Sequence, residues 1–242
     1  MKKILEIKNL DKSFGGVHAI NDLSFDIYEG EILGLIGPNG CGKSTTVNLI
    51  TGVYIQDSGE ILFDGKSLKK ELVPDRAAMG LARTFQTPKP FSNMTVFDSV
   101  YTVCMLYNKS MKAAAKRANE LLELTGFTDM ADTLCSKLPI EKRKWLDMTR
   151  ALATNPKILM LDECLAGLTP SEIESSIEMV KKINATGITI LFIEHVMSAV
   201  VNLCTRVVVM ESGHFLSEGD PQVVMRQPEV IKAYLGEDYE NA

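Results

Sequence analysis

Residues 32–45 decide the fold: they read Ile-Leu-Gly-Leu-Ile-Gly-Pro-Asn-Gly-Cys-Gly-Lys-Ser-Thr. The first five are almost wholly apolar, which is typical of a β-strand buried on both faces of a parallel sheet. The turn Gly37–Gly40 interrupts that strand, and Lys43–Ile50 has helical character and ends at Gly52. The stretch therefore predicts a strand, a glycine-rich loop and a helix in direct succession.

The segment Gly37–Ser44 also fits the phosphate-binding pattern G-x-x-x-x-G-K-[ST]. Glycines let consecutive backbone N–H groups surround phosphates, and the helix that follows directs its positive end at them. We expect Lys43 to reach the outer phosphates and the hydroxyl of Ser44 to ligate Mg²⁺. The alternative is a glycine-rich surface turn, but the strand before it and the helix after it favour the phosphate site. The candidate ATP-binding residues of this loop are Gly37, Pro38, Asn39, Gly40, Cys41, Gly42, Lys43, Ser44 and Thr45.

A second apolar run, Ile158–Leu161, ends in two acids, Asp162 and Glu163. A metal-bound phosphate needs a carboxylate at the end of a neighbouring strand, and this run supplies one. Asp162 is expected to hold Mg²⁺ through water, and Glu163 to polarise the attacking water as a general base. A strand that simply ends in two solvated acids is the alternative. Together the two elements indicate nucleoside triphosphate hydrolysis and leave a kinase open.

Composition narrows the class of protein. The 242 residues include 26 Lys and Arg against 31 Asp and Glu, a formal net charge of −5, which argues against a generally basic nucleic-acid binder. Hydrophobic residues make up 45%, which excludes wholesale disorder. No apolar run approaches the length of a bilayer span, so we expect a cytosolic chain. The five cysteines lie far apart without a CxxC pair, so they are expected to be buried, reduced thiols.

The order of the expected elements predicts an α/β fold of one domain, 1–242. Strands are predicted at 4–7, 23–27, 32–36, 61–63, 158–161, 188–193 and 206–210. Helices are predicted at 43–50, 96–106, 111–124 and 139–153, from a capping box at 169–172 to Asn184, and as two short segments from Pro221 and Pro228. Strands that alternate with helices imply a mostly parallel sheet. The core is expected at 1–86 and 156–242, with 87–155 as an inserted α-helical subdomain.

Over nearly its whole length the sequence resembles the ATP-binding subunits of ABC transporters, and most of all the ATPases of branched-chain amino-acid-type importers. The likeness is carried by Ser13–Val17, Gly37–Thr45, Ala82–Gln86, Phe91, Met94–Val96, Ile158–Glu163, Ala166–Leu168, Ile193–His195 and Pro228–Glu237. The block Arg83–Gln86 and the ending Ala233–Glu237 are the features that make the sequence most similar to the branched-chain amino-acid-type importer ATPases. The resemblance implies a P-loop NTPase (RecA-like) core, an N-terminal antiparallel β portion and a helical subdomain.

The same resemblance assigns roles to three residues outside the two motifs. It implies that Gln86 touches Mg²⁺ and the attacking water and links the site to the membrane subunit. It implies that His195 hydrogen-bonds the γ-phosphate. It implies that Phe14 stacks on adenine, with core packing as the rival interpretation. Cys41, inside the loop, is interpreted as a passive small residue rather than an oxidation-sensitive one.

One motif departs from the family pattern. Members work as dimers in which one subunit's signature, normally Leu-Ser-Gly-Gly-Gln, faces the nucleotide of the other. Here the matching positions are Leu138, Pro139, Ile140, Glu141 and Lys142. Cys164 and Thr169 also differ from the usual proline and aspartate. We therefore expect a competent phosphate loop, a signature that serves a partner poorly, and unequal ATP sites in a heterodimer.

The resemblance implies ATP and Mg²⁺ as cofactors, a second ABC ATPase subunit, transmembrane permease subunits and, indirectly, a solute-binding protein. It also implies a cytoplasmic chain, peripheral on the inner face of the cell membrane. Alternatives are a regulatory nucleotide-binding module with little turnover and the ATPase of a related exporter. A soluble ABC protein of DNA repair or translation fits less well, since those usually carry two cassettes or a coiled-coil insertion. The solute is not encoded in this chain.

Overall fold

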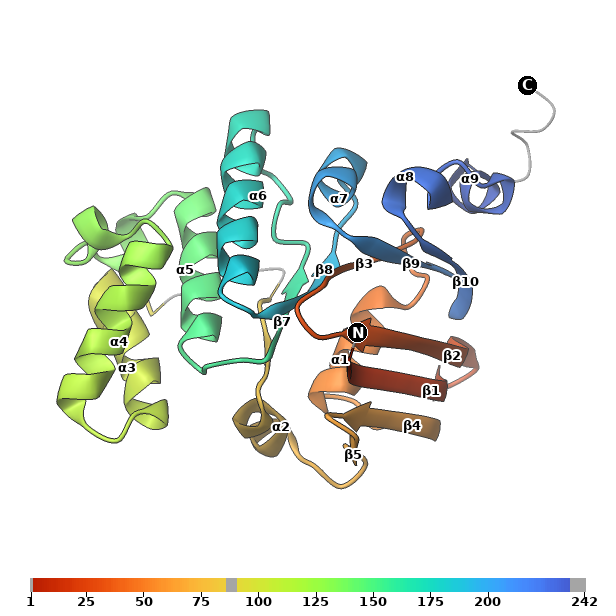
Figure 1. Cartoon of the computed structure of the whole chain (residues 1–242), viewed down its shortest axis with the longest axis horizontal. Coiled ribbons are helices and arrows are strands. Elements are labelled where there is room, and N and C mark those ends of the chain that lie inside the picture. Colours follow the sequence, from red (N-terminus) through yellow and green to blue (C-terminus); the bar gives the residue numbers. More distant parts are fainter. Residues whose placement is uncertain (1, 86–90, 236–242) are drawn as a thin grey trace. The chain divides into compact units, whose positions relative to one another are not determined.

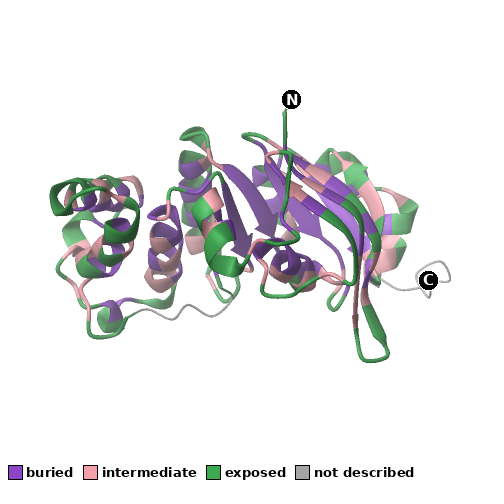
Figure 2. Ribbon diagram, turned by 90° about the horizontal axis from the view of Figure 1, so that it is seen from below, coloured by how far each residue is buried: buried purple, intermediate pink, exposed green. Residues whose placement is uncertain are grey.

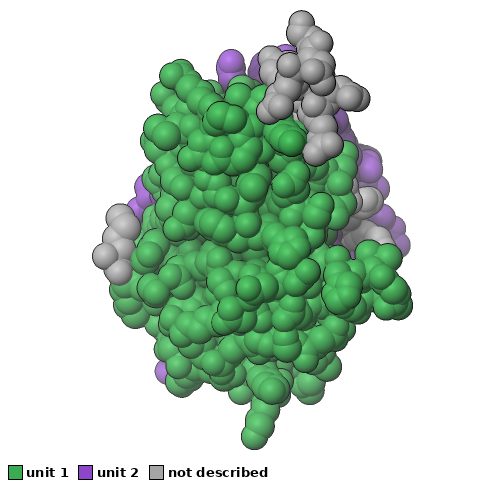
Figure 3. Space-filling model, turned by 90° about the vertical axis from the view of Figure 1, so that its right-hand side faces the viewer, with its two compact units in different colours: residues 1–76, 189–242 green, residues 77–188 purple. Residues whose placement is uncertain are grey.

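The computed structural model describes residues 2–85 and 91–235 (Figure 1). The chain divides into two compact units (Figure 3). Unit 1 comprises residues 1–76 and 189–242, and unit 2 comprises residues 77–188. Figure 2 shows buried residues gathered on the strands, while exposed residues cover the outer faces of the helices. The fold is α/β, as the sequence predicts.

Unit 1 contains an antiparallel sheet in the order β2-β1-β4-β5. Its strands are β1 (Lys3–Phe14), β2 (Val17–Tyr28), β4 (Ser58–Phe63) and β5 (Lys66–Ser67). The predicted strands 4–7 and 23–27 are therefore only parts of two strands of 12 residues each. The β1–β2 register shifts at several points, for example between Ile7 and Leu10, and each shift interrupts the alternation that marks a strand in the sequence.

The phosphate-loop stretch belongs to a second set of strands in unit 1. Strand β3 (Ile32–Ile36) pairs in parallel with β8 (Thr189–Ile193) on one side and with β9 (Arg206–Glu211) on the other. Strand β10 (His214–Gly219) pairs with β9 in antiparallel fashion. All five residues of β3 are buried, as expected for a strand covered on both faces.

The helices of unit 1 begin and end where the sequence signals lie. Helix α1 (Lys43–Thr51) starts after Gly42 and is closed by Gly52 in a left-handed conformation. Arg76, on α2 (Val73–Met79), is buried and donates from its guanidinium to the carbonyls of Leu49 and Ile50, which end α1. The remaining helices are α7 (Met197–Leu203), α8 (Pro221–Val224) and α9 (Pro228–Leu235).

Unit 2 pairs two parallel strands, β6 (Leu81–Arg83) and β7 (Ile158–Asp162). Its helices are α3 (Val96–Tyr107), α4 (Met111–Leu124), α5 (Ile140–Leu152) and α6 (Pro170–Ala185), with short 3₁₀ turns at Thr128–Met130 and Cys135–Lys137. Thr95 caps α3 by accepting from the Asp98 N–H, and Thr169 with Glu172 forms the predicted capping box of α6.

Five of the described helices and strands were not predicted from the sequence: α2, β5, β6, α7 and β10. They are short, and β10 carries mostly polar residues, so none has a strong hydrophobic period. Pro139, predicted in the first turn of its helix, is instead the residue that precedes it. The expected helical subdomain, 87–155, falls inside unit 2, and its boundaries stay a prediction. Over residues 2–85 and 91–235, no helix is long and apolar enough to span a bilayer.

Candidate functional site

The backbone of the phosphate loop is shaped by glycines that tolerate no side chain. Gly37 has φ 149°, and a Cβ there would overlap the carbonyl oxygen of Met210 and lie 2.7 Å from Cys41 Sγ. Gly42 has φ 108°, and a Cβ there would lie 2.7 Å from the carbonyl oxygen of Ala19. Real Cβ atoms do not approach neighbours so closely, so both positions require glycine.

The lysine of the motif lies inside this loop. Lys43 Nζ donates to the carbonyl oxygens of Gly37 at 2.7 Å and Pro38 at 2.9 Å, and the residue is buried. Ser44 is exposed in the first turn of α1, where backbone N–H groups have no partners within the helix. The loop therefore combines an ammonium, a hydroxyl and a helix N-terminus. Together these groups donate the hydrogen bonds that the phosphates of a nucleotide accept.

A buried cysteine and a half-buried tyrosine lie beside the loop. Burial raises the pKa of the Cys41 thiol, and the Lys43 ammonium beside it lowers that pKa only in part, so the group is protonated at neutral pH. Tyr234, on α9, belongs to the C-terminal stretch that carries the family likeness, and the sequence gives it no role of its own. Burial raises the pKa of its phenol to about 12, while the nearby Gly37 N–H lowers it. The C-terminal helix thus reaches the start of the phosphate loop.

His195 lies at the same edge of the parallel strands as the loop. Leu35 of β3 is paired with Ile193 of β8, so the chain leaves both strands side by side, toward Gly37 and toward His195. His195 is exposed, and its backbone N–H donates to Glu194 Oε2 at 3.3 Å. The structure therefore brings together two of the predicted site regions within unit 1.

Phe14 is not a core residue. It ends β1 with 41% of its surface exposed, at the hairpin to β2. Its ring meets Tyr54 edge-to-face at 5.0 Å between centroids, and Lys12 Nζ lies 5.4 Å from its centroid. An exposed ring held by an aromatic neighbour suits a base-stacking role better than core packing.

In unit 2, the two acids predicted from the sequence lie at the end of β7, beside β6. Arg83 is paired with Met160 across the two strands, and the Asp162 N–H donates to Thr84 Oγ1 at 3.3 Å. Asp162 is buried, and its Oδ2 lies 3.3 Å from Arg83 Nη2. Glu163 adopts a left-handed φ of 50°, uncommon for a non-glycine residue and frequent at functional sites. Gln86, three residues after Arg83 in the chain, lies outside the described residues.

Unit 1 and unit 2 each carry an oxygen donor of the kind that binds Mg²⁺. Magnesium is a hard cation that prefers carboxylate, hydroxyl and phosphate oxygens, usually with several waters. Asp162 supplies a carboxylate whose charge is compensated by Arg83, and Ser44 supplies a hydroxyl. The residues present thus fit the metal that the motif implies.

The replaced signature forms the start of α5. Pro139 precedes the helix without a side-chain cap, Leu138 is buried and Ile140 is 51% exposed. Lys142 Nζ lies 3.5 Å from the centroid of the Trp145 ring and 4.0 Å from Glu141 Oε2. The ammonium is therefore directed at the aromatic ring and at its neighbouring carboxylate.

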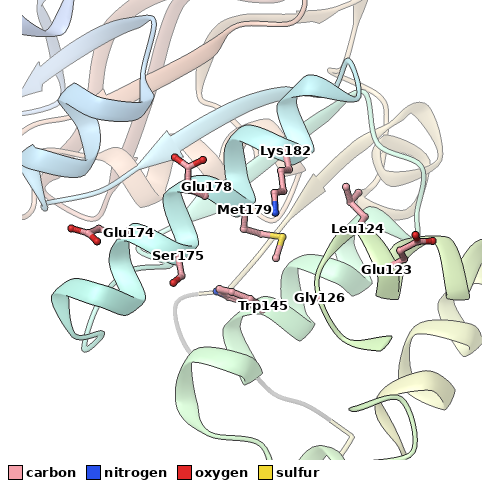
Figure 4. Close-up of a pocket in the computed structure, with 9 residues that line it drawn as sticks. All are labelled: Glu123, Leu124, Gly126, Trp145, Glu174, Ser175, Glu178, Met179 and Lys182. Atoms are coloured by element: carbon pink, nitrogen blue, oxygen red, sulfur yellow. The ribbon is translucent and has the colours of Figure 1, made fainter. Parts of the chain in front are cut away.

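Trp145 also borders a hollow of about 480 Å³ in unit 2 (Figure 4). The lining residues are Glu123, Leu124, Gly126, Trp145, Glu174, Ser175, Glu178, Met179 and Lys182. Glutamates outnumber lysines in this lining, so the hollow has the wrong charge for a phosphate chain.

The phosphate loop, placed between a buried parallel strand and a helix, defines the class: a P-loop nucleoside triphosphatase. Within that class, a family model described as ABC transporter matches residues 20–166. The chain belongs to the ABC transporter family, as an ATP-binding subunit of a transporter; such subunits hydrolyse ATP and work as dimers with transmembrane permease subunits.

Individual relatives support this assignment over nearly the full chain. A high-affinity branched-chain amino acid transport ATP-binding protein, LivG of Escherichia coli, is 34% identical over 97% of this chain and 98% of the relative. The lipopolysaccharide export system ATP-binding protein LptB of Escherichia coli is 30% identical with the same coverage of both chains. The crystal structure of a nucleotide-free ATP-binding cassette from an ABC transporter, 31% identical, superposes with a TM-score of 0.88 over 98% of this chain and 100% of that one. A second model, described as branched-chain amino acid ATP-binding cassette transporter, matches residues 216–240.

Several residues beside the site had no signal of their own in the sequence. Tyr54 is an isolated aromatic residue, and Asp147 is one of two acids on α5. Asp147 accepts from the Phe85 N–H at 3.1 Å, which ties α5 to the chain beyond Arg83. The contact of Asp147 is revealed only by the packing of α5, and that of Tyr54 only by its position beside Phe14 in unit 1.

Replacing Phe14 by Ala is expected to weaken ADP and ATP binding about tenfold, because stacking on a base contributes about 1–3 kcal/mol. Phe14→Trp should retain the affinity, since it keeps an aromatic face. Binding is measured by calorimetry on the purified chain, with Val17→Ala, an exposed neighbour in the same hairpin, as the matched control. An unchanged nucleotide affinity in Phe14→Ala would show that Phe14 does not stack on adenine.

Proposed function

We propose that this chain powers a membrane importer for amino acids or related small polar solutes. The observation that carries the proposal is the match of residues 216–240 to the branched-chain amino acid cassette model, together with the likeness to LivG. LptB, at 30% identity with equal coverage, makes an exporter ATPase the second candidate. The block Arg83–Gln86 supports import by family likeness.

The chemistry follows from the donors of the two units. We propose that the loop Gly37–Thr45 binds the phosphates of ATP through its N–H groups, with Lys43 leaving the loop carbonyls for the outer phosphates. Glu163 orients and deprotonates the attacking water, and His195 donates a hydrogen bond to the γ-phosphate. Phe14 stacks on the adenine, and Gln86 contacts the attacking water. Ser44, Asp162 and Gln86 would hold Mg²⁺, which neutralises charge on the phosphates.

We propose further that the two ATP sites of the working dimer are unequal. In the place of a hydroxyl and two glycines, the chain has Pro139, which precedes α5 and lacks an N–H, and then Ile140 and the carboxylate of Glu141 in the first turn. At about 4 Å from a phosphate charge and an effective dielectric constant near 20, a carboxylate is repelled by at most about 4 kcal/mol. Lys142 offsets little of this, because its ammonium faces Trp145 and lies at the limit of ion-pair distance from Glu141. A partner with an intact signature would therefore serve this chain's ATP better than this chain serves the partner's.

The proposed setting is the inner face of the cell membrane, where the chain attaches to separate permease subunits. A solute-binding protein would act indirectly, through the permease. Closure of the dimer on ATP and its reopening after hydrolysis would drive the permease, with the segment around Phe85–Val96 as the proposed contact.

The importer assignment is tested by direction of transport. The purified complex with its permease, in vesicles whose ATPase face is outward, should move a labelled amino acid or amide out of the lumen, toward the side of ATP. Glu163→Gln should bind ATP but abolish both transport and phosphate release. Movement away from the ATPase face would support the exporter instead. ATP binding without phosphate release in the complete complex would support the regulatory module.

Restoring the signature tests the unequal sites. Pro139→Ser, Ile140→Gly and Glu141→Gly together should raise the ATP turnover of a dimer of this chain alone at least about tenfold, since they remove the carboxylate and supply donors. Asp132→Gly, outside the first turn of α5, serves as the control. Phosphate release is measured at saturating Mg-ATP. No rise in turnover would contradict the unequal-site proposal.

A further inference from the structure

Arg83 and Asp162 form an ion pair at the ends of two adjacent parallel strands. Arg83 Nη2 lies 3.3 Å from Asp162 Oδ2, and only 14% and 6% of the two side chains are exposed. Arg83 Nε donates to the Thr84 carbonyl at 3.2 Å, and its Cζ lies 4.9 Å from the centroid of the Phe85 ring. The guanidinium thus lies between the carboxylate proposed to hold Mg²⁺ and the chain that leads to Gln86.

A buried carboxylate needs a compensating cation, and Arg83 supplies one without any metal. A divalent cation near the same carboxylate changes that balance. The guanidinium and the metal repel one another, and both are attracted to Asp162, so they compete for it. A guanidinium stays charged at every physiological pH, so this competition cannot be relieved by loss of a proton.

The ring of Phe85 offers the guanidinium a second place to lie. A planar guanidinium stacks favourably on an aromatic face, and Arg83 already lies close to this one. Phe85 is 59% exposed, and its N–H is held by Asp147 Oδ2 of α5. Arg83 can therefore weaken its bond to Asp162 without entering an apolar core.

We propose that Arg83 is a positioning residue that acts as the resident counter-cation of Asp162, and that Mg²⁺ arriving with nucleotide displaces its guanidinium from that carboxylate. The inference rests on the proposed role of Asp162 as a magnesium ligand. If Arg83 competes with the metal in this way, the chain binds Mg²⁺ weakly in the absence of nucleotide. The position of the Arg83 side chain then depends on whether Mg²⁺ is bound. A permanent pair that only orients Asp162 is the competing explanation.

The test compares Arg83→Met with the wild-type chain, with Lys116→Met as a control that removes an exposed positive charge from α4 of unit 2. The first readout is thermal unfolding with Mg²⁺ and no nucleotide. Mg²⁺ should raise the Tm of Arg83→Met by about 2–4 °C and leave the wild type and Lys116→Met unchanged, because only Arg83→Met removes the guanidinium that competes with the metal for Asp162.

The second readout is the Mg²⁺ concentration that half-saturates the metal-dependent gain in ADP affinity. This concentration should fall about tenfold in Arg83→Met, while ADP affinity in EDTA stays at the wild-type value. Arg83→Lys should restore wild-type behaviour. Arg83→Gln, whose amide can donate to Asp162 without a charge, replaces Arg83→Met if that variant does not fold.

Three results are decisive against the inference. Arg83→Met with wild-type Mg²⁺ dependence would show that the guanidinium does not compete with the metal, and a higher Mg²⁺ requirement would show that it only orients Asp162. In both cases Asp162→Asn should still lose the Mg²⁺ dependence, so the proposed metal role would survive. Wild-type Mg²⁺ dependence in Asp162→Asn would instead overturn that metal role, and the inference with it.

Discussion

The site depends on a backbone constraint at the end of β3. Gly37 passes so close to the Met210 carbonyl and to Cys41 that no Cβ fits, and Gly42 is confined in the same way by Ala19. The Met210 and Ala19 carbonyls belong to β9 and β2, so strands outside the loop fix its backbone path. The direction of α1, and with it the donor groups of its first turn, follows from that curl.

In each unit, the charged side chain proposed to act on the nucleotide or its metal already has an electrostatic partner. Lys43 lies on the carbonyl oxygens of Gly37 and Pro38, and Asp162 lies beside the guanidinium of Arg83. Under the proposed mechanism, phosphates take the place of the carbonyls, and magnesium takes the place of the guanidinium. Each exchange swaps one favourable electrostatic contact for another, so neither Lys43 nor Asp162 loses its electrostatic partner, and the displaced guanidinium keeps the ring of Phe85.

Most of the fold follows from the sequence because its signals are local. The buried strand Ile32–Ile36, the cap at Thr95 and the capping box at Thr169 are each encoded within a few residues, and the structure has all three. The full lengths of β1 and β2 were not predictable, since irregular register hides their alternation. The contacts of Arg83, Tyr54 and Tyr234 depend on residues distant in the chain, so no sequence pattern could reveal them. Whether Gln86 contributes as the family likeness implies stays a prediction, since it lies outside the described residues.

The most direct test of the account is a double-mutant cycle between Ser44→Ala and Asp162→Asn, read out as ATP affinity by calorimetry in Mg²⁺ and again in EDTA. If the hydroxyl of unit 1 and the carboxylate of unit 2 hold one metal on one nucleotide, their effects in Mg²⁺ should be coupled by about 1 kcal/mol or more, and the coupling should vanish in EDTA. Additive effects in Mg²⁺ would show that the two groups do not share a metal, and the proposed site would be contradicted.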